Sequence, residues 1–406
     1  MKRFVILILL ISIITSAQQE ATIYQDNTHL RKGPGSYYPL LGILLKDALV
    51  TILQETSGWV KISTSGREGW ISQNALSEKD RATSSMKTSD FKNVRPTFLS
   101  RASASGAVKG FAQTYLKKHD GSMTFLDQYD TAFFQPREYE NFRQETYRNR
   151  NMKKIRKRYR RIKIENKEPE INSYLEKMGF AVAGQIATGG LETDIQKLRY
   201  INMVGNLIVE STPLYYYPFK FYILSDERPV AYATPNGMIF VSQGLLDVLQ
   251  SEAELACVLG HEISHVVQQH GYSEVTKRKT QIVAEGAFDE LEEEMPEGFS
   301  DEELDDLAFQ MFEAATSRRQ TEYEYEADMM GVIYAYQAGY APHGLASVLK
   351  SIKSMTSRDF WHPESNWQYN AIEDRSEKVT AFISAELKKN SDWNVENSHR
   401  FNRVFH

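Results

Sequence analysis

Apolar and polar residues alternate over short segments in the first part of the chain. The alternation is clear in Leu49 to Leu53, and turn signals such as Gly33-Pro34-Gly35 and Ser57-Gly58 separate one segment from the next. A period of two is typical of strands with one buried face, and Gly-Pro and Ser-Gly pairs are typical of the turns that join them. The pattern predicts a small all-β barrel over residues 20–78.

A polar stretch and then a basic stretch follow the predicted barrel. Residues 77–101 contain few large apolar side chains and are typical of a linker. Residues 107–147 contain enough aromatic side chains to predict ordered helices, although no motif stands out there. The run RNRNMKKIRKRYRRIK, residues 148–163, could bind anionic lipid or a polyanionic wall polymer, but we favour a solvated helix that faces an acidic segment further along the chain. We therefore expect a linker and a basic helical region over residues 79–169.

From about residue 170 the apolar residues recur at helical spacing. Two helical segments come first, the strand-like segments FKFYILSD and VAYATPNGMIFVS follow, and helical spacing then returns. Ser251, followed three residues later by Glu254, has the capping-box pattern, and Gly271 is a stop signal. These signals predict a helix over residues 252–270.

Length and composition agree with more than one domain. A chain of 406 residues suggests two or three domains, and 41% hydrophobic and 25% charged residues are ordinary for a globular protein. The expected fold class is multidomain: the small barrel, then a mainly α (α+β) domain with a small edge-stranded sheet over residues 170–388, and a C-terminal tail over residues 389–406. The net charge of −5 gives no basis for a nucleic-acid partner.

The first residues have the pattern of a secretion signal. Lys2 and Arg3 precede an apolar run, Phe4 to Ile14, and the small residues of Thr15-Ser16-Ala17 suit a signal peptidase. The run is shorter than the roughly 20 residues of a membrane-spanning helix, and no later stretch is long and apolar enough to span. We expect residues 1–17 to be a signal peptide and the chain to be exported, with the periplasm favoured and secretion or an uncleaved N-terminal anchor as alternatives.

The only cysteine, Cys257, limits the chemistry of the chain. It cannot form an internal disulfide or supply a cysteine-only zinc site. Because it falls within the predicted helix over residues 252–270, a small buried thiol is favoured over a nucleophile.

The same helix carries the segment His261-Glu262-Ile263-Ser264-His265. Side chains four apart on a helix lie nearly one above the other, so His261 and His265 would present two imidazole nitrogens to one point. Two neutral imidazoles at this spacing make half of a tetrahedral zinc site, and Glu262 beside them can take a proton from a metal-bound water.

The sequence after His265 restricts the third ligand. The metzincin pattern needs Gly three residues and His six residues after the second histidine, and Gln268 and Gly271 stand there, so that class is excluded. His270 is five residues on, and a helix that continues to it would turn its side chain away from the metal, so we expect it at the surface.

Two glutamates remain as candidates for the third ligand. Glu285 lies 20 residues after His265 and has Asp289 one turn later, but it begins an acidic stretch in which most carboxylates must be solvated. Glu324 lies in TEYEYEADMMGVIYAYQAGYAP, which reads as a second helix, and Asp328 would share its face one turn later. Spacing alone leaves both open.

The barrel segment resembles the bacterial SH3 domain. The matching residues are Asn27, Leu30-Arg31, Gly33-Pro34, Gly58-Trp59 and Gly69-Trp70-Ile71. The resemblance implies either a cell-wall or peptide ligand or a role in positioning a catalytic neighbour. Trp59 and Trp70 could line a ligand groove, although a role in the barrel core is favoured.

The segments ELACVLGHEISHVVQQHG and EYEADMMGVIYAYQAGYAP together resemble the HtpX- and BepA-like family of HExxH zinc metallopeptidases, which includes the CAAX-prenyl proteases. The resemblance implies a zincin-type fold and one Zn²⁺ per chain, with Glu324 as the third ligand and Asp328 supporting a ligand histidine. Glu326 would be a structural or ion-paired carboxylate. Gly331 would allow the two helices to approach closely.

The resemblance also extends to the segments on either side. FWHPESNWQYNAIEDR is similar to the His-Pro…Arg element of that family, which makes His362 and Arg375 candidates for stabilising the oxyanion; His362 could instead gate the metal or be structural. VAYATPNGMIFVSQGLL is similar to the strand beside the active site, with Val230-Ala231 and Asn236-Gly237 as departures. A protein or peptide substrate would bind there in extended conformation, along Val230, Ala231, Tyr232, Ala233 and Thr234.

These expectations lead to one function and two alternatives. We expect an exported zinc endopeptidase that hydrolyses envelope or misfolded proteins, with no membrane span after signal removal. The alternatives are a cell-wall peptide hydrolase targeted by its SH3 domain and a non-catalytic binding or chaperone module. The acidic insertion over residues 272–317 could be a lid or a solvated hairpin, and the sequence does not decide between them.

Overall fold

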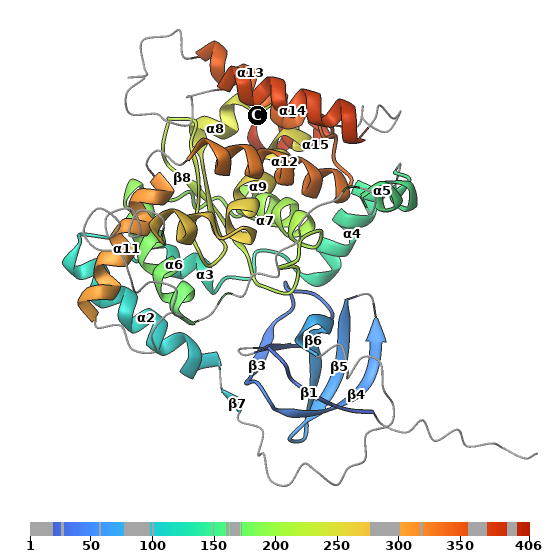
Figure 1. Ribbon diagram of the computed structural model, residues 1–406, viewed down its shortest axis with the longest axis vertical. Helices are drawn as coiled ribbons and strands as arrows, with labels where there is room; N and C mark the ends of the chain where they lie inside the picture. Colours follow the sequence, from blue (N-terminus) through green and yellow to red (C-terminus); the bar gives the residue numbers. More distant parts are fainter. Residues whose placement is uncertain are drawn as a thin grey trace, which may run out of the picture. The chain divides into compact units, whose positions relative to one another are not determined.

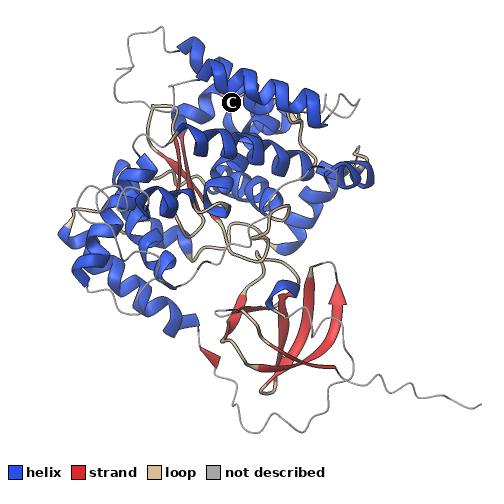
Figure 2. Cartoon of the chain, in the orientation of Figure 1, coloured by secondary structure: helices blue, strands red, loops and turns tan. Residues whose placement is uncertain are grey.

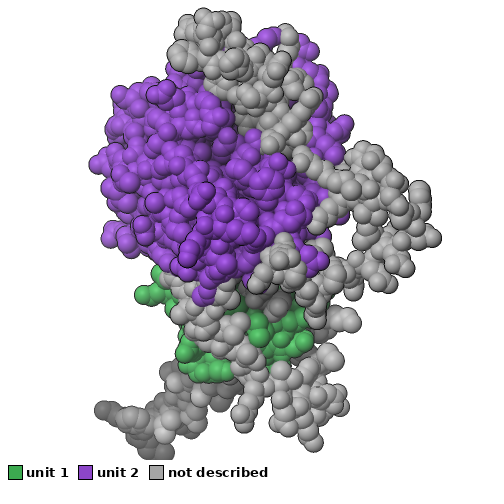
Figure 3. Space-filling model, turned by 90° about the vertical axis from the view of Figure 1, so that its left-hand side faces the viewer, with its two compact units in different colours: residues 1–34, 39–101 green, residues 35–38, 102–406 purple. Residues whose placement is uncertain are grey.

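The computed structural model describes residues 19–25, 28–56, 58–76, 98–99, 101–148, 150–159, 162, 171, 173–276, 301–316, 320–355, 372–387 and 396–406. The chain divides into two compact units (Figure 3). One contains residues 1–34 and 39–101, and the other contains residues 35–38 and 102–406.

The first unit is built from strands (Figure 2). They are β1 (Gln19–Thr22), β2 (Thr28–Arg31), β3 (Leu40–Leu44), β4 (Leu49–Thr56), β5 (Trp59–Thr64), β6 (Arg67–Ser72) and β7 (Phe98–Leu99), with a 3-10 helix η1 (Gln73–Ala75) after β6. Antiparallel pairing orders them β1-β4-β5-β6-β2-β3-β7. The predicted small all-β fold is confirmed, but among the described strands β1 and β7 end the sheet, so it does not close into a barrel.

Alternating side chains of these strands form the core of the first unit. Leu30, Ile62 and Ile71 are fully buried in it, as expected for strands with one apolar face. Trp59 is 7% exposed and belongs to the buried residues, whereas Trp70 is half-buried.

The second unit is mainly helical (Figure 1). Its elements are α2 (Arg101–Lys118), α3 (Phe125–Tyr129), α4 (Pro136–Tyr147), α5 (Met152–Tyr159), α6 (Ser173–Ile186), η2 (Ala187–Gly189), α7 (Ile195–Val209), β8 (Lys220–Leu224), β9 (Ala231–Ala233), β10 (Met238–Ser242), α8 (Gln243–Val248), α9 (Glu252–Val267), α11 (Asp301–Thr316), α12 (Thr321–Gln337), α13 (Gly344–Met355), α14 (Ile372–Phe382), the π-helix η4 (Ile383–Leu387) and α15 (Ser398–Phe405). The predicted mainly α domain with a small sheet is therefore confirmed.

The small sheet has β9 at one edge. Its order is β8-β10-β9, with β10 parallel to β8 and antiparallel to β9. All five residues of β10 are buried, as expected for the central strand of a covered sheet. The turn between β9 and β10 needs Gly237, whose φ of 78° is a conformation that other residues rarely adopt.

Helices α9 and α12 cross at two glycines. A Cβ atom added to Gly260 would lie 2.5 Å from the carbonyl oxygen of Gly331, and one added to Gly331 would lie 2.4 Å from the backbone nitrogen of His261. Because a side chain at either position would separate the helices, the prediction that Gly331 allows close approach is confirmed. Gly260 has the same role on the partner helix.

Helix α9 begins where the capping pattern predicts, but it ends before the predicted last residue, His270. The Ser251 hydroxyl accepts from the backbone N–H of Glu254, and the Glu254 carboxylate accepts from the N–H of Gln250. At the other end the helix stops at Val267, not His270, because Gln269 adopts the left-handed conformation with φ of 53°. Helical turns resume at His270, so Gly271 lies inside the next helical segment rather than at the end of α9.

Two parts of the chain that lie outside the predicted domains contribute to the core of the second unit. Within the predicted linker and basic region, α2 and α4 bury Tyr115 and Tyr139 in the same hydrophobic core as α9. Within the predicted C-terminal tail, α15 buries Phe401, and Arg400 donates hydrogen bonds to the buried carboxylate of Glu252 at the start of α9. The described part of that tail is therefore a packed helix. Its aromatic residues recur four apart, a helical spacing that could have indicated it.

Across the described residues, no helix has both the length and the apolar character needed to span a bilayer. Residues 1–17, predicted as a signal peptide, lie outside them.

Candidate metal centre

The two histidines of the HEISH segment point to the same place. His261 and His265 lie one turn apart on α9, and their Nε2 atoms are 3.1 Å apart. The carboxylate of Glu324, on α12, has one oxygen 3.5 Å from Nε2 of His261 and the other 3.4 Å from Nε2 of His265. All three residues are buried, and their ligand atoms lie within 4.8 Å of one another. Two imidazole nitrogens and a carboxylate oxygen are a donor set that suits zinc.

Asp328 and Arg375 brace this group from one side. Oδ1 of Asp328 lies 2.8 Å from Nδ1 of His261. Arg375, on α14, donates to Asp328 from Nε at 2.8 Å and from Nη2 at 2.7 Å, and its Nη1 lies 3.2 Å from Oε2 of Glu324. Because Asp328 engages Nδ1 of His261, it is Nε2 that faces Glu324.

The pKa values of this group follow from its burial and its charges. Burial by itself lowers the pKa of His261, but the hydrogen bonds and charges of Asp328 and Glu324 raise it to about 9. Burial would raise the pKa of Asp328, whereas the charge and hydrogen bonds of Arg375, helped by His261, lower it to about 2. Asp328 therefore stays ionised at neutral pH.

The net charge of the site also fits a divalent cation. When ionised, Glu262, Glu324 and Asp328 carry three negative charges, and Arg375 carries one positive charge; each is at most 5% exposed. Metal ligation requires both histidines to be neutral, so His261 would lose its proton when the ion binds; the protein groups of the site would then have a net charge of −2, and buried charge is costly unless it is balanced. A divalent ion between His261, His265 and Glu324 would balance it.

His270 is buried beside the site, which corrects the expectation of a surface residue. It is 2% exposed, and its Nδ1 lies 2.8 Å from Nδ1 of His265. Its Nε2 lies 3.3 Å from Oε2 of Glu326, and its ring stacks on Tyr323 at a centroid distance of 4.6 Å. The expectation was wrong because it assumed a continuous helix; the left-handed Gln269 turns the chain so that His270 comes back under α9.

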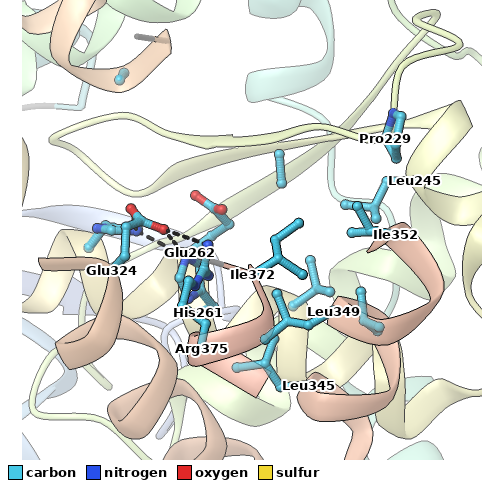
Figure 4. A pocket seen from close by; sticks show the side chains of 15 residues that line it. Pro229, Leu245, His261, Glu262, Glu324, Leu345, Leu349, Ile352, Ile372 and Arg375 are labelled. Atoms are coloured by element: carbon cyan, nitrogen blue, oxygen red, sulfur yellow. Dashed lines mark hydrogen bonds and ion pairs between the residues drawn. The ribbon is translucent and has the colours of Figure 1, made fainter. Parts of the chain in front are cut away.

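A pocket opens beside the metal group and continues into an apolar region (Figure 4). Its empty volume is about 610 Å³ including its open mouth. The polar lining residues are His261, Glu262, His265, Glu324 and Arg375. The remaining lining residues are apolar: Pro229, Ala231, Leu245, Val258, Ala315, Leu345, Val348, Leu349, Ile352 and Ile372.

The predicted substrate strand borders this pocket. Ala231 of β9 lines it, and Ala233 and Thr234 line a smaller neighbouring pocket that also includes His265. Val230 and Thr234, which flank β9, are hydrogen-bonded to β10 through the Val230 carbonyl and the Thr234 N–H, each at 2.9 Å. Tyr232, between the two alanines, is half-buried.

Helix α11, the longer of the two described parts of the acidic insertion, lies next to these pockets. It packs against α6 and β9, and Ala315 near its end lines both pockets. Residues 277–300 of the insertion, including Glu285, lie outside the described residues.

The other predicted site residues fall in different places. His362 lies outside the described residues. Arg375 lines the pocket, where its guanidinium contacts two carboxylates, and its role as an oxyanion donor stays a prediction. Cys257 is fully buried and is absent from the pocket lining.

Sequence reasoning missed His270, Gly260 and the apolar wall of the pocket. A helix glycine directly before His261 was a signal for the close crossing. The apolar residues of α13 carry no motif, because any amphipathic helix shows the same spacing.

Comparison with known proteins places both units. Residues 196–389 match the model of Peptidase family M48, and residues 26–77 match that of the Bacterial SH3 domain. The beta-barrel assembly-enhancing protease of Yersinia pestis is 36% identical over 91 residues, which are 22% of this chain and 19% of the relative. Metalloprotease YcaL of Escherichia coli (strain K12) is 29% identical over 196 residues, 47% of this chain and 73% of the relative.

A relative of another kind also matches. The putative N-acetylmuramoyl-L-alanine amidase YrvJ of Bacillus subtilis (strain 168) is 38% identical over 81 residues, which are 20% of this chain and 16% of the relative. The match to the beta-barrel assembly-enhancing protease likewise spans only about a fifth of that relative's length. The family assignment itself rests on the two domain matches, and it confirms the resemblance expected from the sequence. The chain carries a metallopeptidase domain of family M48 and, before it, a bacterial SH3 domain.

Proposed function

We propose that this protein is an exported zinc-dependent endopeptidase that hydrolyses proteins of the cell envelope, misfolded ones included. The observation that carries the proposal is the buried convergence of His261, His265 and Glu324 beside Glu262, in a pocket bordered by an edge strand. A family match to M48 peptidases supports the same chemistry.

The proposed roles follow from the positions of the side chains. His261, His265 and Glu324 would hold one Zn²⁺, which when bound lowers the pKa of a water molecule to about 7 and polarises the peptide carbonyl. Glu262 would accept a proton from the attacking water and pass it to the leaving nitrogen. Asp328 would keep His261 in the tautomer that presents Nε2.

The pocket supports an unfolded segment as substrate. An extended peptide could add to the edge at β9, which uses backbone hydrogen bonds and reads little sequence. The apolar lining beyond Glu262 would then accept one aliphatic or aromatic side chain next to the scissile bond. Apolar side chains in extended backbone are accessible mainly in unfolded or misassembled proteins, which agrees with the proposed substrates.

Export and envelope location rest on the signal-like pattern of residues 1–17 and on the name of one relative, a beta-barrel assembly-enhancing protease. The SH3 domain would bind a cell-wall or peptide ligand.

A second candidate is a cell-wall peptide hydrolase. It is favoured by the similarity to a putative N-acetylmuramoyl-L-alanine amidase. Clearing of purified cell wall in a zymogram, without cleavage of unfolded casein, would support this candidate and overturn the first.

The ligand assignment can be tested on the full-length protein. Zinc content and casein cleavage would be measured for wild type, Glu324→Gln, Glu285→Gln and Glu322→Gln. We expect loss of zinc and of cleavage in the Glu324 variant only. Glu322 is an exposed glutamate on the same helix and serves as the matched control. Loss of zinc in the Glu285 variant, with zinc kept in the Glu324 variant, would contradict the assignment.

A further inference from the structure

We propose that His270, backed by Glu326, is the positioning residue for His265 and selects the tautomer in which His265 turns Nε2 toward the metal site. The inference rests on the proposed zinc site. His270 lies outside the HExxH and Glu-x-Glu-Ala-Asp segments, and Glu326 is the middle glutamate of the second segment.

The geometry puts one imidazole directly behind another. Nδ1 of His265 and Nδ1 of His270 are 2.8 Å apart, while Nε2 of His265 faces Nε2 of His261 at 3.1 Å. The two rings of His265 and His270 meet nearly at right angles, with an interplanar angle of 72°. Both residues are buried, at 4% and 2% exposure. The 2.8 Å between the two Nδ1 atoms is a hydrogen-bond distance, and because both rings are buried, water cannot easily take the place of either partner.

Helix α12 contacts the ring of His270 on the side away from His265. His270 stacks on Tyr323 with an interplanar angle of 22°, and its Nε2 lies 3.3 Å from Oε2 of Glu326. Tyr323 and Glu326 are three residues apart and so share one face of α12, whereas Glu324 and Asp328 share another. One helix therefore supports the Nδ1 side of both ligand histidines, directly through Asp328 at His261 and through His270 at His265.

The direction of the hydrogen bonds follows from metal ligation. A neutral imidazole has one N–H, so if Nε2 of His265 is to bind a metal, its proton must be on Nδ1. That N–H then donates to Nδ1 of His270, and the proton of His270 must be on Nε2, where it donates to Glu326. The opposite direction would place a proton on Nε2 of His265, where the metal has to bind.

The two amide substitutions of His270 separate this role from simple packing. In asparagine the amide oxygen is bonded to Cγ, like Nδ1 of histidine, so His270→Asn keeps an acceptor beside His265. In glutamine the amide is one carbon further out, near the position of Nε2, so His270→Gln removes that acceptor. His270→Phe also removes it but keeps a ring to stack on Tyr323.

Zinc affinity is measured for each variant by competition with a chromogenic chelator. We expect the glutamine and phenylalanine variants to bind zinc about 10–100-fold more weakly, the loss typical of removing a partner behind a ligand histidine, and the asparagine variant to stay close to wild type. The matched controls are His343→Gln and His343→Phe, because Nε2 of His343 lies 2.9 Å from Glu396 in another histidine–carboxylate pair. They should leave zinc affinity unchanged.

A purely structural role predicts a different pattern. The asparagine and glutamine variants would then lose zinc affinity equally, in step with a lower melting temperature of the metal-free protein. That result would overturn the inference.

Nitrogen-detected spectra of the zinc-loaded wild type give a second readout that folding defects cannot mimic. They should show the proton of His265 on Nδ1 and that of His270 on Nε2, with the His270 signals assigned by their loss in His270→Asn. A proton on Nδ1 of His270 would also overturn the inference.

The outcomes distinguish this inference from the proposed function. Stoichiometric zinc binding by wild type without any cleavage would overturn the peptidase activity and leave the positioning role in place. Cleavage and zinc binding that are indifferent to all His270 variants would overturn only the positioning role. A wild type that binds no zinc would overturn both.

Discussion

The polar end of the pocket comes from three helices that contact one another, whereas the apolar end takes its largest share, Leu345, Val348, Leu349 and Ile352, from one face of α13. At the polar end α9, α12 and α14 contribute His261, Glu324 and Arg375, which are tied by hydrogen bonds and ion pairs. At the apolar end Leu349 and Ile352 of α13 face Leu245 of α8, and the wall offers shape rather than hydrogen bonds (Figure 4). From this comparison we expect that hydrolysis depends on single atoms at the polar end, while substrate choice depends on the volume of the apolar end.

The largest expected effect is at the polar end. Glu262→Gln keeps the size of the side chain but removes the base, so kcat on a fluorogenic peptide should fall about 10²–10⁴-fold. Zinc content and the preference among peptides should not change, because the ligands and the apolar wall are untouched. Glu322→Gln is the control. Loss of zinc from the Glu262 variant, or a wild-type kcat, would break the proposed separation of the two ends.

The second largest effect is expected on the stability of the polar end. Arg375→Leu leaves Asp328 and Glu324 buried without their cation, and removing one partner of a buried pair typically costs about 3–5 kcal/mol. Urea unfolding of the metal-free protein should show this loss, and added zinc should restore part of it. The control, Arg228→Leu, removes an exposed pair with Asp226 and should cost at most about 1 kcal/mol. Equal losses in the two variants would argue against a tightly coupled polar end.

The smallest effect is expected at the apolar end. Wild type should cleave peptides with Leu or Phe next to the scissile bond about 10–200-fold more efficiently, by kcat/KM, than peptides with Ala there. Ile352→Phe fills part of the pocket and should shrink that ratio without changing zinc content, whereas Ile195→Phe, at a position 45% exposed, should not. A wild type with no preference for an apolar side chain at either flanking position would contradict the role given to this wall.

Local patterns were enough to locate the elements that carry the polar end. Ser251 and Glu254 marked the start of α9, and the spacing of His261 and His265 placed both on one face, because helix geometry depends only on nearby residues. The same holds for Glu324 and Asp328 on α12. The choice of Glu324 over Glu285 needed the family resemblance, since spacing gives no distance between two helices.

The other features of the site could not be predicted from the sequence. They depend on the direction that the chain takes after α9 and on contacts between segments that lie far apart in the sequence. A single left-handed residue, Gln269, turns His270 from the predicted surface into the neighbour of His265. The apolar wall forms only where α8, α13 and α14 meet beside α9. The contact between α15 and Glu252, which makes α15 part of the packed domain rather than a tail, likewise joins distant parts of the chain. Sequence patterns, together with the family resemblance, were enough to name the residues that can bind a metal and the helices on which they lie. The groups that hydrogen-bond to these residues, and the side chains that line the pocket, are set by the fold, because both depend on packing between residues far apart in the chain.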